Sequence, residues 1–289
     1  MPTAPYLVDL RDLAVRLAIA AGAELLVRQQ ELSIDAAGVE TKSSASDPVS
    51  AADRAAEKLI VDGFTAVRPG DGVLGEEGAS RPSTTGLTWV IDPLDGTVNY
   101  LYGRADWCVS IAVEDTDGAI VGVVHQPRTG TTWFATRAGG AHRTDPSPTV
   151  PADSPAGWFA DPVPGWGPAQ RARRLGPPRE RRLETALVST GFSYLPERRA
   201  EQAATLQDLL PAVRDIRRGG SAALDLCSVA DGTADAYYEH VIQPWDVAAG
   251  ALIAREAGAT VVRPFPQGIL AAAPSVAEPL IELLTRRSV

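Results

Sequence analysis

Cysteine and histidine are scarce in this chain of 289 residues, which has two cysteines and three histidines. Cys108 and Cys227 form no C-x-x-C pair and lie in apolar stretches, so we expect buried free thiols rather than a disulfide or a zinc site. His125, His142 and His240 have no H-x-x-x-H spacing and share no motif with a serine, which argues against a histidine metal site and a Ser-His-Asp triad. Neither a P-loop nor G-x-G-x-x-G occurs, which excludes P-loop kinases and simple dinucleotide-binding folds.

Positive charge and long apolar runs are also lacking. The formal net charge of −9 argues against an electrostatic nucleic-acid binder. An anionic substrate must then meet local positive charge, which bound cations supply better than this surface does. The apolar run 17–23 stops at Glu24, so we expect neither a signal peptide nor a membrane span, and a cytoplasmic protein.

Helix-like and strand-like stretches fill the rest of the chain. With 45% hydrophobic residues, it can bury a core as one large domain or as two closely packed halves. Helical periodicity and capping residues predict helices over 9–30, 50–64, 197–210, 244–257 and 275–285, and another that Ser221 caps. β-branched and aromatic runs predict strands over 73–74, 89–91, 107–113, 119–124, 131–135, 183–189, 213–217, 233–239, 261–262 and 269–273, of which the three between 107 and 135 form an antiparallel meander.

The segment 144–182 separates two regular parts of the chain. It holds nine prolines and a run of arginines, so we expect an irregular insertion or linker. A contact with a partner or a second copy through its tryptophans is the alternative. The expected organisation is an N-terminal half over 1–143, this linker, and a C-terminal half over 183–289.

The stretch 89–100 combines a buried strand with two acids, and we expect it to organise a metal site. Pro93 has no N–H for a sheet, so we expect pairing to end where Asp92 and Asp95 appear. Both carboxylates and the Leu94 carbonyl can then face one point, and these hard oxygen ligands favour Mg²⁺ over zinc. Gly96 and Thr97 add backbone N–H groups that can hold a phosphate. Asp-Pro and Asp-Gly steps are also ordinary turn signals, so this stretch alone leaves a simple turn open.

Three further acids each have an ordinary structural interpretation. Asp53 follows Ser50 by three residues, as in a capping box, and Asp246 stands where an aspartate caps a helix. Glu76 belongs to a Glu-Glu pair of the kind that is usually solvated surface charge. From the residues alone, structural and functional roles both stay open.

The motifs together resemble the inositol monophosphatase family of Mg²⁺-dependent, lithium-sensitive phosphatases, and its bacterial inositol-1-monophosphatases most of all. Its signature W-x-x-D-P-x-D-G-T-x-N-[FY] is filled at every fixed position of 89–100. D-x-V-[ST]-x-x-D matches 47–53, G-E-E matches 75–77, and a strand-end glutamate precedes W-D-x-[AG]-[AG]-[AG] at 245–250. The resemblance covers nearly all of the chain except 144–182. It implies a mixed α/β (α+β) fold, the layered αβαβα sandwich of that family, and a homodimer.

The resemblance also assigns roles to residues. Two to three Mg²⁺ ions are implied, because like charges about 4 Å apart repel by roughly 4 kcal/mol at an effective dielectric near 20. One ion is implied at Glu76, Asp92 and the Leu94 carbonyl, a second at Asp92, Asp95 and Asp246, and a weaker third near Glu76. The resemblance implies that Asp53, Glu76 and Thr97 activate water and that Gly96 and Thr97 bind the phosphate. It implies that the substrate is bound by Asp95, Ala222, Glu239 and Asp246. Lys42 is implied to lie in a mobile loop.

The expected reaction is hydrolysis of inositol 1-phosphate by water activated by metal. Val98 and Asn99 favour this substrate, since relatives acting on 3′-phosphoadenosine phosphate or histidinol phosphate often place lysine after the threonine. Fructose-1,6-bisphosphate, NADP or another sugar phosphate stays open, because such pockets tolerate many alcohols. A non-catalytic regulatory protein on the same fold is the second class of hypothesis.

Overall fold

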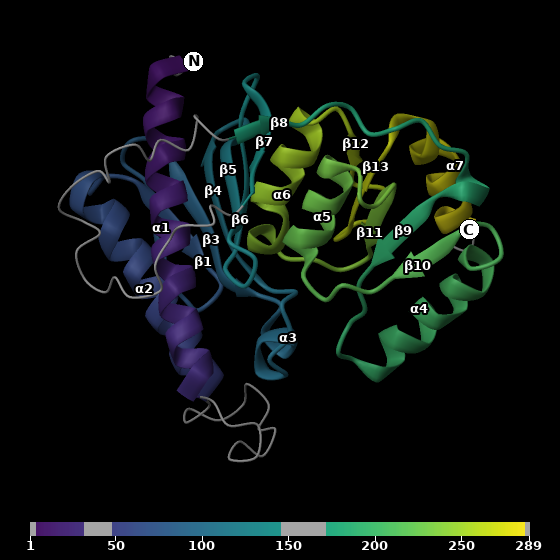
Figure 1. Cartoon of the computed structure of the whole chain (residues 1–289), viewed down its shortest axis with the longest axis horizontal. Coiled ribbons are helices and arrows are strands. Elements are labelled where there is room, and N and C mark those ends of the chain that lie inside the picture. The colour runs from purple at the N-terminus through teal and green to yellow at the C-terminus, as the bar shows by residue number, and fades with distance from the viewer. Residues whose placement is uncertain (1–3, 32–47, 146–171, 287–289) are drawn as a thin grey trace.

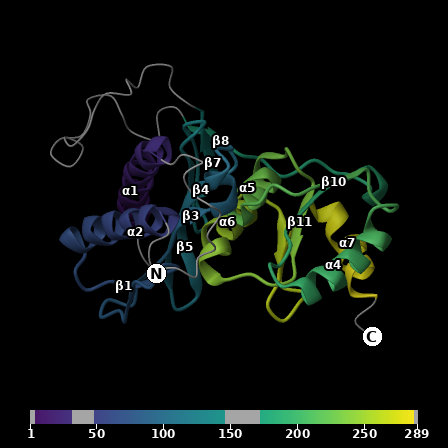
Figure 2. The ribbon, with the colours of Figure 1, turned by 90° about the horizontal axis from the view of Figure 1, so that it is seen from below.

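The computed structural model describes residues 4–31, 48–145 and 172–286. Its elements form five layers, which Figure 1 shows side by side: two helices, an eight-stranded sheet, two central helices, a five-stranded sheet and two outer helices. The same succession is visible from below in Figure 2. The predicted αβαβα sandwich is therefore confirmed. No helix in the described ranges is both long enough and apolar enough to cross a membrane.

The first layer consists of α1 (Ala4–Glu31) and α2 (Pro48–Val67). Residues of α1 at helical spacing, Leu17, Ala21 and Leu25 among them, are buried against the first sheet. The helix α2 begins at Pro48, two residues before the predicted start. Ser50 therefore lies inside the helix, and the interpretation of Asp53 as a capping residue is wrong.

The first sheet has the strand order β2-β1-β3-β4-β5-β6-β7-β8, and only the β1–β3 pair is parallel. The meander β4–β5–β6 is confirmed. The strand β8 lies within the predicted linker and pairs with β7, because the chain returns to the sheet edge before crossing to the second half. Residues 146–171 of that linker lie outside the described residues. The strands are β1 (Gly72–Gly75), β2 (Ser80–Arg81), β3 (Thr88–Asp95), β4 (Cys108–Asp115), β5 (Gly118–Gln126), β6 (Thr131–Thr136), β7 (Gly140–Thr144) and β8 (Ala172–Arg174).

Pairing along β3 does not end at Pro93, so this expectation is wrong. Asp92 still faces Ser110 and Asp95 faces Cys108, with a shift of register between the two pairs. The irregularity accommodates the proline, because a residue without an N–H is tolerated where the ladder is broken. The strand therefore carries both acids instead of stopping before them.

The second sheet has the order β10-β9-β11-β13-β12. The predicted strand over 183–189 begins instead as a short 3₁₀ turn, Leu183–Thr185, and becomes β9 (Leu187–Thr190) only afterwards. The outer helices α4 (Pro196–Leu209) and α7 (Pro274–Thr285) cover its far face (Figure 1). The other strands are β10 (Asp215–Arg217), β11 (Ala236–Glu239), β12 (Thr260–Val262) and β13 (Ile269–Ala272).

Small residues let the central helices α5 (Ala222–Asp231) and α6 (Pro244–Glu256) pack closely between the sheets. A Cβ at Gly122 of β5 would lie 2.7 Å from the Ala249 carbonyl oxygen, and one at Gly250 would lie 2.8 Å from the Leu226 Cβ. One buried cluster joins these helices to both sheets. The two halves therefore share a core, which fixes the positions of their facing edges. We call the boundary between these edges the seam.

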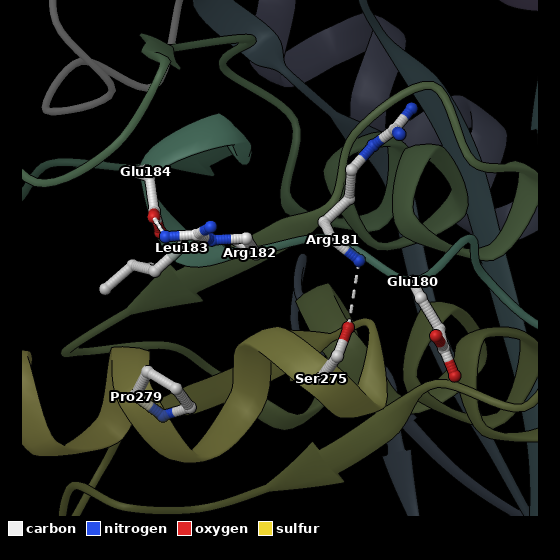
Figure 3. Close-up of a pocket in the computed structure, with 7 residues that line it drawn as sticks. All are labelled: Glu180, Arg181, Arg182, Leu183, Glu184, Ser275 and Pro279. Carbon is white, nitrogen blue, oxygen red and sulfur yellow. Dashed lines mark hydrogen bonds and ion pairs between the residues drawn. The ribbon is translucent and has the colours of Figure 1, made fainter.

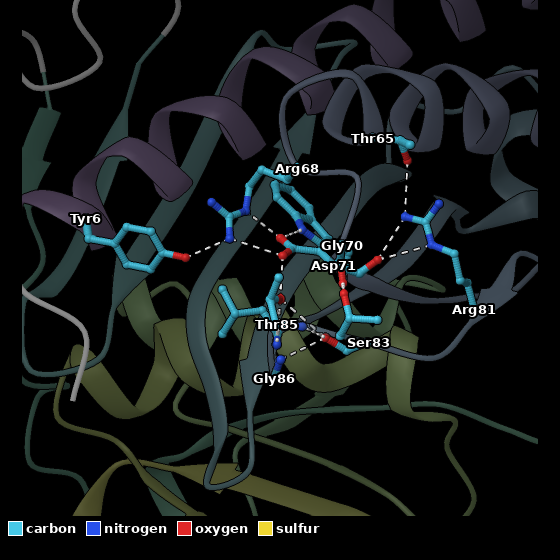
Figure 4. Close-up of polar contacts among 12 residues, drawn as sticks. Tyr6, Thr65, Arg68, Gly70, Asp71, Arg81, Ser83, Thr85 and Gly86 are labelled. Atoms are coloured by element: carbon cyan, nitrogen blue, oxygen red, sulfur yellow. Dashed lines mark hydrogen bonds and ion pairs between the residues drawn. The ribbon is translucent and has the colours of Figure 1, made fainter.

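Away from that seam, the buried carboxylate of Asp71 ties α1, α2 and β3 together (Figure 4). It accepts hydrogen bonds from Arg68, from the Thr85 hydroxyl at 2.6 Å and from the Trp89 indole N–H at 3.0 Å, and Arg68 also donates to the Tyr6 hydroxyl at 2.7 Å. Burial raises the pKa of Asp71, but these hydrogen bonds, with that from Arg68 the largest, outweigh burial and hold it below its ordinary value.

Replacement of Asp71 by asparagine should lower the free energy of unfolding by about 3 kcal/mol, because it leaves the Arg68 charge without its buried partner. Urea unfolding measures this loss. The matched control is Asp62→Asn, which breaks an exposed pair with Lys58 and should cost less than about 1 kcal/mol. Equal losses in the two variants would contradict the assignment.

Candidate active site

The strand β3 brings two acids to the seam between the halves. Asp92 is 1% exposed, and its carboxylate accepts a hydrogen bond from the Leu94 N–H at 3.0 Å. Asp95 ends the strand, and its carboxylate accepts from the Ser221 hydroxyl at 2.6 Å and the Ala223 N–H at 2.8 Å. One acid is therefore fixed within its own turn, and the other against the first turn of α5.

The segment after β3 requires glycine. Gly96 has φ 96°, and a Cβ there would lie 2.8 Å from the Asp106 carbonyl oxygen. Thr97 then opens α3 (Thr97–Leu101), and its hydroxyl donates to the Leu94 carbonyl at 3.3 Å. Leu94 falls in the register shift of the sheet, so this carbonyl faces the turn that carries the acids.

Glu76 reaches the same place from the end of β1. Its backbone N–H donates to the Ile91 carbonyl at 3.1 Å, which sets Glu76 beside the residue preceding Asp92. Asp53 comes from α2, is fully buried, and is close enough for its charge to act on Asp92. Two further elements of the N-terminal half thus contribute acids to the seam.

Asp246 is the third residue of α6 and does two things. Its carboxylate accepts from the Gln243 N–H at 2.9 Å in a capping box, and it also makes a side-chain hydrogen bond with Asp92. Asp246 can therefore both cap the helix and belong to the acid cluster, because α6 begins at the seam.

A second group of acids lies beside Asp95 on the C-terminal half. Glu239 at the end of β11 accepts from the Tyr237 hydroxyl at 2.8 Å, and a Cβ at Gly191 would collide with its carboxylate. Asp225 of α5 is buried, makes a side-chain hydrogen bond with Ser189, and interacts electrostatically with both Asp95 and Glu239. Ala222 opens α5, directly before the Ala223 N–H that binds Asp95.

Burial and crowding raise the pKa values of these acids. Burial, followed by the charges of Glu76, Asp95, Asp246 and Asp53, raises the pKa of Asp92 well above its ordinary value. Burial and the Asp246 charge raise the pKa of Asp95 to about 7, and burial raises the pKa of Asp246 to about 6. Burial likewise raises the pKa of Glu239 to about 7 and the pKa of Asp225 to about 8.

The donor set fits hard divalent cations. In the described part of the chain, no Lys or Arg ion pair balances Asp92, Asp95 or Asp246. Carboxylate and carbonyl oxygens are the ligands that Mg²⁺ takes. Within the same residues, no three acidic, imidazole or thiol groups already surround one point as ligands.

A groove of about 650 Å³ lies elsewhere, between residues 180–184 and the start of α7 (Figure 3). There the Arg181 N–H donates to the Ser275 hydroxyl at 3.0 Å, and the charged residues 180–182 and 184 are exposed. None of the acids described above lines it. We therefore take the acid cluster at the seam, not this groove, as the candidate active site.

Comparison with known proteins identifies the family of this chain. Residues 7–287 match the model of the inositol monophosphatase family. The chain belongs to this family. It is 41% identical to the inositol-1-monophosphatase of Mycobacterium leprae, over 96% of this chain and 94% of that protein. A solved structure, Mycobacterium tuberculosis SuhB, is 38% identical, covers 96% of both chains and superposes with a TM-score of 0.77. Family members are phosphatases, so a phosphatase is the enzyme class this membership supports.

A further relative has a different kind of name. The Nus factor SuhB of Xylella fastidiosa is 38% identical over 76% of this chain and 70% of that protein. Its name does not describe a hydrolase. Family membership thus supports a phosphatase without fixing one substrate.

The structure brings most of the sequence-predicted residues together. Four acids lie close enough to Asp92 for their charges to raise its pKa: Asp53, Glu76, Asp95 and Asp246. Glu239 lies near Asp95 and Asp246. Lys42 lies outside the described residues. The sequence interpretation missed Ser221 as a partner of Asp95, and it missed Asp225. It also missed Glu57, whose carboxylate accepts from the Glu77 and Ala79 N–H groups; the available signal was its place one helical turn after Asp53.

Asn99, which the sequence analysis takes as favouring inositol 1-phosphate, also has a structural role. Its side-chain amide donates to the Asp106 carbonyl at 2.6 Å and the Gly219 carbonyl at 2.9 Å, so it joins α3 to the loop before α5. Val98 beside it is 41% exposed. The pair therefore carries less weight for substrate choice than the family motif alone suggests.

The acid cluster predicts a pH dependence for the protein in EDTA. Folded pKa values of about 7 for Asp95 and about 6 for Asp246 exceed the ordinary value, so the folded state binds protons that the unfolded state has lost. The free energy of unfolding should fall by several kcal/mol as pH rises from 4 to 7, because each unit by which a folded pKa exceeds the unfolded pKa corresponds to about 1.4 kcal/mol.

Urea unfolding in EDTA between pH 4 and pH 8 measures this slope. The control is Asp95→Asn, which removes one titrating carboxyl and should flatten the curve. A stability that rises steadily over this range would contradict the assignment.

Proposed function

We propose that this protein is a Mg²⁺-dependent phosphomonoesterase that hydrolyses inositol 1-phosphate to inositol and phosphate. The proposal rests on a cluster of acids around the buried Asp92, made by Asp53, Glu76, Asp95 and Asp246. Among the described residues, no ion pair with Lys or Arg balances Asp92, Asp95 or Asp246. Two to three bound ions would neutralise the phosphate, activate water and stabilise the leaving alcohol.

The chain's own residues then divide the work. Glu76, Asp92, the Leu94 carbonyl, Asp95 and Asp246 hold the ions. The Gly96 and Thr97 N–H groups bind phosphate oxygens, while Asp53, with Thr97 and Glu76, orients and deprotonates the attacking water. Asp95, the Ala222 backbone, Glu239 and Asp246 receive the hydroxyls of the alcohol, which positions the ester bond.

We also propose that the protein acts in the cytoplasm as a homodimer and is inhibited by Li⁺, as the family resemblance implies. In the proposed organisation, 144–182 links the halves 1–143 and 183–289. Fructose-1,6-bisphosphate, NADP, histidinol phosphate and 3′-phosphoadenosine phosphate are the competing substrates.

Phosphate release should depend on Mg²⁺, and inositol 1-phosphate should be the preferred member of a panel with those four competitors. Asp92→Asn should lower kcat/KM by about a thousandfold, which corresponds to roughly 4 kcal/mol of lost transition-state stabilisation. Turnover that persists in EDTA, or full activity of Asp92→Asn, would defeat the mechanism. Preference for another ester would defeat the substrate alone.

Glu239→Gln tests recognition of the alcohol separately. KM for inositol 1-phosphate should rise about tenfold, the effect of losing one charge-assisted hydrogen bond. KM for phenyl phosphate, whose alcohol lacks other hydroxyls, should stay unchanged. Equal changes for the two esters would place Glu239 outside the alcohol pocket.

A regulatory role is the second candidate, and the relatives named Nus factor SuhB motivate it. The Asp92→Asn variant separates the two functions, because a role in assembly does not need turnover. In cells whose growth requires the protein, a regulatory role predicts that this variant replaces the parent without a growth defect. If growth fails, the phosphatase role is sufficient to explain the requirement.

A further inference from the structure

A buried glutamate that the proposed chemistry leaves unused lies directly beneath the turn that carries Glu76. Glu57 follows Asp53 by one turn of α2 and is 6% exposed. Its Oε2 accepts from the Glu77 N–H at 3.0 Å, and its Oε1 accepts from the Ala79 N–H at 2.9 Å. Both carboxylate oxygens are thus engaged with the backbone of the turn that Glu76 opens.

Gly75 makes this contact possible. A Cβ there would collide with the Glu57 Oε2 and lie 2.7 Å from its Cδ, so any other residue would force the carboxylate away. The Gly75 N–H donates to the Ala79 carbonyl at 2.8 Å, and the Glu76 N–H donates to the Ile91 carbonyl at 3.1 Å. The turn 75–79 is therefore held by three sets of hydrogen bonds: one within the turn, one to β3 and the pair to Glu57.

A carboxylate suits this place better than the other polar side chains. It offers two acceptor oxygens and no donor, and it faces two N–H groups. A glutamine would present its NH₂ to one of them and leave that N–H unsatisfied. The turn could satisfy these donors with water at the surface, so a buried acid beside Glu76 and Glu77 calls for a further reason.

We propose that Glu57 is a positioning residue that holds Glu76 against Asp92 and thereby sets the affinity of the site for a divalent cation. This rests on the proposed function, since Glu76 is a proposed ligand. Residues that orient metal ligands typically contribute about 10- to 100-fold to metal affinity. Asp53 and Glu57 then act from one face of α2, one toward the reacting water and the other through the Glu76 turn.

The test uses the full-length protein stripped of metal. Isothermal titration with Mg²⁺ should show Glu57→Gln binding about 10- to 100-fold more weakly than the parent. Gly75→Ala should do the same, because it displaces the carboxylate from the opposite side. The double variant should be no weaker than either single variant, since both act through one contact. In phosphate release, the Mg²⁺ concentration for half-maximal rate should rise while kcat at saturating Mg²⁺ stays within about threefold of the parent.

Asp71→Asn is the matched control. It removes a buried, hydrogen-bonded carboxylate from the same half and should cost stability without changing Mg²⁺ affinity. Parent-like binding by Glu57→Gln, or an equal loss in Asp71→Asn, would overturn the role of Glu57 and leave the proposed function standing. A parent protein that binds no Mg²⁺ would overturn both. If Glu57→Gln does not fold, Gly75→Ala decides by the same criteria.

Discussion

Mutual repulsion among buried carboxylates is the constraint on which this molecule depends. Asp92 lies under the charges of Glu76, Asp95, Asp246 and Asp53, in a place where water cannot screen them. Such a cluster is stable only if protons or cations balance it. The scaffold must therefore hold the elements that carry these acids in fixed relative positions, and the shared core does so. Gly122 and Gly250 let α6 approach both β5 and α5, so that the helix carrying Asp246 cannot shift independently of the sheet carrying Asp92.

The acids are also held individually, and by backbone groups as often as by side chains. Asp92 binds the Leu94 N–H, Asp95 the Ala223 N–H, and Asp246 the Gln243 N–H. Backbone donors orient a carboxylate without adding a competing positive charge, which an arginine would bring. Each acid is thus oriented at the seam by neutral donors. Cations bound there would supply the positive charge that a protein with a net charge of −9 needs to bind the proposed anionic ester.

Much of this arrangement was readable from local sequence. The meander and the helix starts at Ser221 and Pro244 follow from periodicity and capping residues, whereas the five-layer order follows only from the family resemblance. The errors arose where tertiary structure overrides a local rule. Pro93 was expected to end β3, but a register shift absorbs it; Ser50 was expected to cap α2, but the helix starts earlier at Pro48. The 3₁₀ turn at Leu183–Thr185 looked like a strand because short apolar runs do not distinguish the two.

Long-range contacts were beyond the reach of local sequence. Nothing near Asp95 shows that its partner is Ser221, 126 positions later, and nothing near Asn99 shows that it binds the Gly219 carbonyl. Both contacts cross the seam at the same loop, 219–221. That loop is thus held by the strand and short helix of the motif 89–100, and it leads into the first turn of α5, on which Ala222 and Asp225 lie. A displacement of Asp95 or Asn99 would therefore be transmitted through these hydrogen bonds to the first turn of α5.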